Sequence, residues 1–155
     1  NYLNQVSEGR LSSESKLQIR EMLREVTEIE SIGDSCYNLA RTINRKRRGS
    51  IDFTEKQYEH IHQMFGLTDS ALTQMIALVE DVHHTVDVNK SFNIENEINN
   101  YRSQLKNQNI IDVNNKEYSY QMGIHYMDII GECEKLGDYV VNVVEAHSDV
   151  KEKKA

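Results

Sequence analysis

Proline and tryptophan are absent from this chain of 155 residues, and glycine occurs only seven times. Proline and glycine are the residues that most often interrupt helices, so few breaks are expected within long helices. No segment shows the strict alternation of apolar and polar residues that is typical of a half-buried strand. These absences argue against a turn-rich β protein and favour a mostly helical one.

The chain also lacks a long apolar run and a surplus of basic residues. No stretch approaches the roughly 20 apolar residues that a membrane-spanning helix needs. The net charge of −7 argues against a general nucleic-acid binder, which usually carries excess lysine and arginine. Cys36 and Cys133 lack the spacing of metal ligands and are expected to be small buried side chains. No nucleophile with an adjacent base and no phosphate-binding glycine loop occurs, so we expect no enzyme.

Apolar residues that recur every three or four positions predict four helices, near residues 12–48, 54–88, 91–109 and 116–148. Ser12 or Ser13 can cap the first helix, and Thr54 with Gln57 predicts a capping box at the second. A break is expected near residues 89–91. Four helices joined by short links predict an all-α antiparallel bundle, and the length of the chain suits one domain over its full extent, 1–155.

The first long helix is expected to bury one apolar stripe. Its members are Ile19, Leu23, Val26, Ile29, Ile32, Cys36, Leu39 and Ile43. Ahead of this helix, Tyr2, Leu3 and Val6 have helical spacing. We expect them to be the tail of a helix that starts earlier in a longer protein.

A polar pattern occurs twice, as EIESIGDSCYN at residues 28–38 and as ECEKLGDYVVN at residues 132–142. Two glutamates, a glycine, an aspartate and an asparagine recur at a constant offset of 104 residues. Amphipathic patterning does not explain identities at polar and glycine positions. The two helices are therefore expected to be equivalent elements of two related halves, with their glycines in equivalent surroundings.

The repeated pattern places carboxylates four residues apart on one helical face, as Glu30 with Asp34 and as Glu134 with Asp138. Like charges at this spacing destabilise a helix by roughly 0.2–0.5 kcal/mol per pair, and a mid-helix glycine costs about 1 kcal/mol against alanine. A divalent or ferric ion bound by the carboxylates would offset these costs. Alternatively, arginines or lysines of other helices pair with Glu30 and Glu134, and the glycines serve packing alone. The sequence leaves both interpretations open.

The repeated motif resembles the hallmark of PhoU-like domains, in particular the PhoU-like domain that follows the membrane part of bacterial sodium/phosphate cotransporters. The resemblance implies two related three-helix repeats, each ending in a helix that carries the acidic motif, with the first repeat truncated here. The chain departs from the family at Ser31 and Lys135, where arginine is frequent.

The resemblance also implies a metal site. It identifies Glu30, Asp34, Glu134 and Asp138 as candidate ligands for iron, zinc or another divalent metal. Glu95, in the stretch SFNIENEINNYR, matches the acidic position of a middle helix and is a further candidate ligand.

The function that the resemblance implies is a non-catalytic regulatory domain of a sodium-dependent phosphate transporter, at the cytoplasmic face of the plasma membrane. The expected partner is the transmembrane part of the same transporter, and a homo-oligomer is a further expectation. The basic run of Arg45, Lys46, Arg47 and Arg48 suits a helix C-terminus, where cations are favoured. It also suits contact with anionic lipid.

Two other functions remain open from the sequence. A carboxylate-bridged metalloenzyme would need acids and histidines that converge inside the bundle, and Glu80 with His83 supplies a single Glu-x-x-His pair of the kind seen in such centres. A purely structural interaction bundle would need its acids paired with basic side chains.

Overall fold

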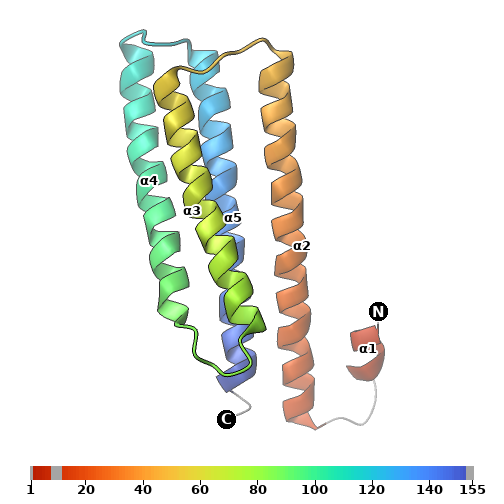
Figure 1. Ribbon diagram of the computed structural model, residues 1–155. Helices are drawn as coiled ribbons and strands as arrows, with labels where there is room; N and C mark the ends of the chain where they lie inside the picture. Colours follow the sequence, from red (N-terminus) through yellow and green to blue (C-terminus); the bar gives the residue numbers. More distant parts are fainter. Residues whose placement is uncertain (1, 8–11, 153–155) are drawn as a thin grey trace.

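The computed structural model describes residues 2–7 and 12–152 and shows an elongated helical bundle (Figure 1). The described residues form five helices and no strand. The helices are α1 (Tyr2–Ser7), α2 (Ser13–Arg48), α3 (Glu55–Glu80), α4 (Val88–Asn114) and α5 (Tyr120–Glu152). The prediction of an all-α antiparallel bundle is confirmed.

Helix α5 is the centre of the arrangement. It packs against α2, α3 and α4, and α3 also packs against α4. Among the described helices, α2 packs along α5 and the short α1, and it meets α3 near its C-terminal end, where Lys46 contacts Tyr58. Figure 1 shows α2 and α5 running in opposite directions. The molecule is therefore a three-helix unit, α3 to α5, with α2 added on one side of α5.

The hydrophobic core lies inside the three-helix unit. Met64, Ile98, Ile130 and Val144 contribute fully buried side chains from its three helices. Of the α2 hydrophobic residues, only Ile32 is buried among those that the structure describes. The expectation that α2 buries its whole apolar stripe is therefore wrong, because α2 has one long helix as its neighbour and not several.

Capping residues fix the starts of α2 and α3 as the sequence predicts. The backbone N–H of Ser15 donates to Ser12 Oγ at 3.1 Å. At α3, the Gln57 N–H donates to Thr54 Oγ1 at 3.1 Å, and the Thr54 N–H donates to Gln57 Oε1 at 3.0 Å. These bonds satisfy backbone donors that have no partner within the helix.

The connection between α3 and α4 lies earlier than the sequence predicts. Helix α3 ends at Glu80, and the break expected near 89–91 is wrong because α4 already begins at Val88. The Asp81 carboxylate accepts hydrogen bonds from the N–H of His83 at 3.1 Å and of Val86 at 2.8 Å. Such local bonds offer the backbone an alternative to the helix, and they end α3.

Candidate functional site

The two copies of the polar motif face each other across the interface of α2 and α5. Asn142 Nδ2 donates to Glu28 Oε2 at 3.2 Å, and Ser35 Oγ lies 3.4 Å from Glu132 Oε2 as donor. Glu28 and Glu132 are equivalent in the repeat, and each accepts a hydrogen bond from the opposite helix. Asn38, the equivalent of Asn142, lines a groove together with Glu132. The contacts of Glu28 with Asn142 and of Ser35 with Glu132 therefore join the two helices.

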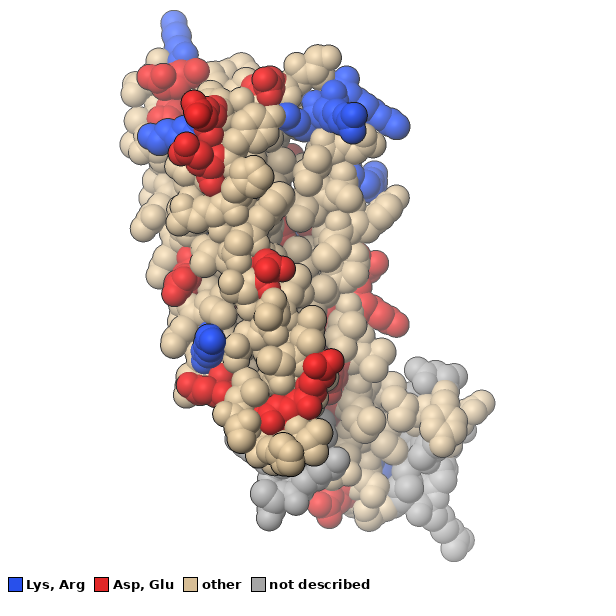
Figure 2. Space-filling model, in the orientation of Figure 1, with Lys and Arg blue, Asp and Glu red and all other residues tan. Residues whose placement is uncertain are grey.

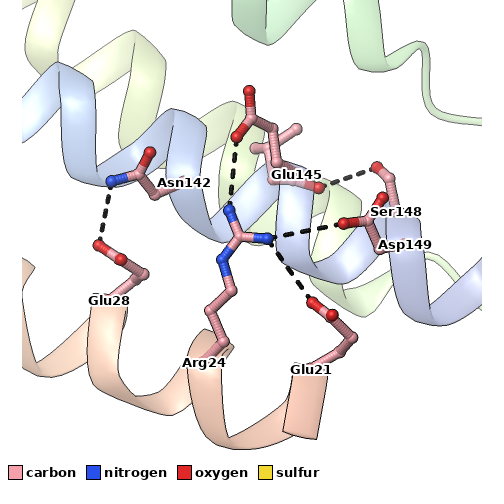
Figure 3. Close-up of polar contacts among 8 residues, drawn as sticks. Glu21, Arg24, Glu28, Asn142, Glu145, Ser148 and Asp149 are labelled. Carbon is pink, nitrogen blue, oxygen red and sulfur yellow. Dashed lines mark hydrogen bonds and ion pairs between the residues drawn. The ribbon is translucent and has the colours of Figure 1, made fainter. Parts of the chain in front are cut away.

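Arg24 extends this polar interface toward the N-terminal end of α2 (Figure 3). Its guanidinium lies 3.5 Å from a carboxylate oxygen of Glu145 and 3.6 Å from one of Asp149, both on α5. A further contact joins it to Glu21 on its own helix at 3.6 Å. All four side chains are at least partly exposed to solvent, so the cluster orients α2 on α5 more than it stabilises the fold.

A half-buried pair that the sequence did not predict lies in the same interface. His147 Nδ1 lies 3.2 Å from Glu25 Oε1, and each side chain is 15% exposed. Neither residue belongs to the repeated motif. The signal that could have found the pair is the antiparallel register itself, because the register that joins Glu28 to Asn142 brings the two residues together.

In the second copy of the motif, α4 supplies the partners of the acidic pair and of the glycine. Arg102 Nε lies 2.8 Å from Glu134 Oε2. A Cβ atom on Gly137 would lie 3.2 Å from Ile98 Cδ1, so the glycine lets α4 approach closely. Burial and the Glu134 charge raise the pKa of Asp138, and Arg102 opposes this shift. The sequence left open whether Glu134 binds a metal or pairs with a basic side chain of another helix. In the structure, Glu134 pairs with Arg102 of α4.

In the first copy of the motif, the equivalent residues are exposed to solvent. Glu30 and Asp34 are exposed, and a Cβ atom on Gly33 would meet no atom within 4 Å. Within the described part of the chain, no hydrogen bond or ion pair joins either carboxylate to another side chain. The expectation of equivalent surroundings for the two glycines is wrong, because α4 covers Gly137 and no described helix covers Gly33.

The predicted metal ligands do not converge within the described residues. No group of three or more histidine, cysteine, aspartate or glutamate side chains there could hold a metal ion. Glu95 accepts a hydrogen bond from Asn99 Nδ2 on its own helix. The carboxylates occur as pairs, so a metal bound to either pair would need further ligands from outside residues 2–7 and 12–152. Metal binding stays a prediction.

Glu80 and His83 do not form a helical pair, because α3 ends at Glu80. Asp87, which would share a helical face with His83, instead caps α4 and accepts a hydrogen bond from the Asn89 N–H at 3.0 Å. This segment therefore lacks the geometry that a di-iron centre built from helical Glu-x-x-His pairs requires.

A polar cavity of about 370 Å³ lies among the ends of α3, α4 and α5. His60 Nδ1 lies 2.9 Å from the Tyr126 hydroxyl inside it. Burial lowers the pKa of His60, as does the charge of Lys56, and burial raises the pKa of Tyr126. Both groups are therefore neutral near pH 7, and the cavity has a neutral polar lining in this part.

A larger groove, of about 620 Å³, runs among α2, α4 and α5. Its charged lining comprises four cationic side chains and two carboxylates: Arg45, Arg102, Lys106, Lys135, Asp128 and Glu132. The groove therefore has a positive surplus, in contrast to the net negative charge of the chain.

The basic run at the end of α2 divides into two kinds of side chain. Lys46 Nζ lies 4.9 Å from the ring centroids of both Phe53 and Tyr58, so it packs onto aromatic faces at the bundle end. Arg45, Arg47 and Arg48 are exposed. Figure 2 shows lysine and arginine side chains gathered over this end of α2. Three of the four predicted membrane-facing cations are therefore free to meet an anionic surface.

Comparison with known protein families gives a match. A family model described as PhoU domain matches residues 61–146, which is more than half of the chain. The match covers α4 and most of α3 and α5. No curated protein and no solved structure matches. No helix of the described residues combines the length and apolarity that crossing a bilayer requires.

Proposed function

The chain belongs to the PhoU domain family, and from this membership we propose that it is a cytoplasmic regulatory domain of a sodium-dependent phosphate transporter. PhoU domains are regulatory and non-catalytic, and they act in phosphate regulation. The absence of an enzymatic function, which the sequence predicts, is confirmed by the family. The proposal goes beyond the family in two respects, namely that the domain belongs to a transporter and that it lies in the cytoplasm.

The observation that carries the proposal is the cluster of exposed cations at the C-terminal end of α2 (Figure 2). Arg45, Arg47 and Arg48 are exposed there, although the chain as a whole has a net charge of −7. The groove that Arg45 lines adds Lys106 and Lys135 to this positive region. Segregated positive charge of this kind attracts the anionic lipids of a cytoplasmic leaflet by about 1 kcal/mol per cation. This attraction supports the proposal that the domain lies at the cytoplasmic surface of the membrane, next to the transmembrane part of the transporter.

Vesicle binding tests the membrane contact. The chain is mixed with vesicles of phosphatidylcholine alone or with a quarter phosphatidylglycerol, and the bound fraction is measured by sedimentation. We expect binding to the anionic vesicles only, with a loss of about tenfold or more in the double variant Arg47→Glu, Arg48→Glu. The matched control is Lys16→Glu with Arg20→Glu at the opposite end of α2. Equal loss in the control, or binding to neutral vesicles, contradicts the membrane contact.

The transporter is tested separately with the complete reading frame that encodes the chain. We expect its product to contain membrane-spanning segments and to drive phosphate uptake into proteoliposomes under a sodium gradient. Removal of residues 1–155 should abolish the dependence of uptake on phosphate inside the vesicle while uptake itself persists. A reading frame without membrane-spanning segments removes the transporter from the proposal and leaves the family membership intact.

A further inference from the structure

The groove of about 620 Å³ among α2, α4 and α5 lies between two helices that do not pack against each other. In the described part of the chain, α2 and α4 both pack against α5, and Figure 1 shows them on opposite sides of it. Residues of α5 such as Gly131 therefore form the floor of the groove, and α2 and α4 form its walls. A molecule bound there would contact all three helices.

Cationic side chains line the groove from each of these helices. Arg45 comes from α2, Arg102 and Lys106 come from α4, and Lys135 comes from α5. Arg45 and Lys106 are exposed and form no ion pair within the described residues. Cations gathered in a groove repel one another and attract anions, because the walls focus their field. This convergence indicates a ligand with negative charge directed toward both walls.

Two of the cations are held in place before any ligand binds. Arg102 Nε lies 2.8 Å from Glu134 Oε2, and its terminal N–H groups remain to donate to a ligand. Lys135 Nζ donates to Glu132 Oε1 at 3.2 Å. Side chains that are already held in one position lose less conformational entropy when a ligand binds.

Asn109 adds a neutral donor to the α4 side of the lining. Its Oδ1 accepts a hydrogen bond from the Tyr118 hydroxyl at 2.7 Å. Because the carbonyl end of the amide has this partner, the N–H groups are the end that remains to bind an anion.

We propose that this groove binds a small soluble molecule that carries a diphosphate group. Arginine and lysine side chains hold phosphate oxygens through charge-assisted hydrogen bonds. Two linked phosphates present oxygens in two directions, toward Arg45 on α2 and toward Lys106 on α4. A single phosphate would leave most of the groove empty. The space beside Ile110 and Met127 accommodates the rest of the molecule.

A ligand in the groove would join α2 to the three-helix unit. Helix α2 packs along α5, and a diphosphate bound between Arg45 and Lys106 adds a link from α2 to α4. Binding should therefore stabilise α2 on the bundle by mass action. The site is independent of the membrane contact proposed for this domain, which is tested at Arg47 and Arg48.

Calorimetric titration of the chain of 155 residues with pyrophosphate, in a buffer without divalent metals, tests the site. Pyrophosphate should bind at least about tenfold more tightly than sulfate or citrate at equal ionic strength. Arg45→Gln with Lys106→Gln should weaken pyrophosphate binding at least about tenfold. Both side chains are exposed, so the melting temperature of this variant without ligand should match that of the unsubstituted chain.

Two further variants separate the groove from general attraction between charges. Arg47→Gln with Arg48→Gln removes the same amount of charge outside the groove lining. It should lower vesicle binding but change the pyrophosphate affinity less than about threefold, because salt screens distant charges. Asp128→Asn removes an exposed carboxylate from the lining, and it should tighten pyrophosphate binding about threefold or more, because a like charge opposes a bound anion.

Hydrogen exchange with mass spectrometry tests the link between the helices. Saturating pyrophosphate should slow amide exchange in α2 around residues 38–45 and in α4 around residues 102–110. Sulfate at the same concentration should slow neither segment.

Four results would overturn the proposal. The first is pyrophosphate binding no tighter than that of sulfate or citrate. The second is an equal loss of affinity in the Arg45→Gln, Lys106→Gln and the Arg47→Gln, Arg48→Gln variants. The third is unchanged exchange of α2 with pyrophosphate bound. The fourth is binding to anionic vesicles, and not to pyrophosphate, that depends on Arg45 and Lys106, because the groove would then hold a lipid headgroup.

Discussion

Gly33 and Gly137 occupy the same position of the repeat and differ only in what surrounds them. Gly137 receives the Ile98 side chain of α4, whereas the space above Gly33 is open. The helix cost of a central glycine is therefore offset by close packing in one case and is uncompensated within the described residues in the other.

Leucine at these two positions should have opposite effects on stability. Gly33→Leu should raise the free energy of unfolding by about 0.5–1 kcal/mol, because leucine favours the helix and meets no neighbour. Gly137→Leu should lower it by about 1–3 kcal/mol, because the side chain would overpack the contact with Ile98. Urea denaturation of the two variants measures both values. Equal destabilisation by both would show that Gly33 is not open in solution.

Asp138 gives the fold a dependence on pH with a defined sign. Burial raises its pKa in the folded chain above the ordinary value of 3.8. Between that value and the raised pKa, the folded state binds more protons than the unfolded state. The contribution of Asp138 to stability therefore falls as the pH rises through this window.

Asp138→Asn should accordingly stabilise the chain at pH 7, with the difference from the unsubstituted protein shrinking as the pH falls toward about 4. Thermal melting at several pH values measures this difference. Asp34→Asn, the matched change on the open side of α2, is the control. A constant difference between Asp138→Asn and the unsubstituted chain across this range would show that the carboxylate does not carry the effect.

At the scale of the elements, α2 and α5 have similar motifs and different numbers of neighbours. Helix α5 packs along three long helices, whereas α2 packs along one and meets α3 near its own C-terminal end. The polar contacts of Arg24, Glu28 and Ser35 hold α2 in register on α5. They are partly solvated, so each contributes about 1 kcal/mol or less.

Backbone amide exchange should therefore be faster in α2 than in α5. Local opening of α2 breaks one helix interface, whereas opening of α5 breaks the whole core. Hydrogen exchange with mass spectrometry should show α2 losing protection first and α5 together with α3 and α4 later. Exchange of α2 and α5 at one common rate would mean that the five helices open as one cooperative unit.

At the scale of the whole molecule, the family match and the packing identify the same unit. Residues 61–146 lie within the span of α3 to α5, which forms the hydrophobic core. Helix α2 lies outside the match and carries a second copy of the acidic motif. The chain thus contains one complete three-helix unit and the equivalent of the last helix of another.

A fragment of residues 51–152 should therefore fold cooperatively on its own, although it should melt below the full chain because the α2-facing side of α5 becomes exposed. A fragment of residues 12–114, which lacks α5, should not show a cooperative transition. Circular dichroism during heating measures both. A cooperative transition in the second fragment, or none in the first, would contradict the central place of α5.

The sequence by itself determined the helices and the repeat. Apolar periodicity and caps such as Ser12 and Thr54 act over a few residues, so the all-α bundle and the starts of α2 and α3 could be predicted. The loop at 81–87 was missed because Asp81 and Asp87 bond to nearby backbone groups, and apolar spacing carries no signal of such bonds.

Only the tertiary structure decided what the repeated residues do. Which partner a carboxylate meets depends on another helix far away in the sequence. Glu134 meets Arg102 of α4, Glu28 meets Asn142 of α5, and Glu30 meets no described side chain. Spacing along one helix places side chains on a common face but does not specify the neighbour of that face. The sequence could therefore identify the acidic positions, whereas the packing of α4 on α5 alone distinguished the covered pair from the open one.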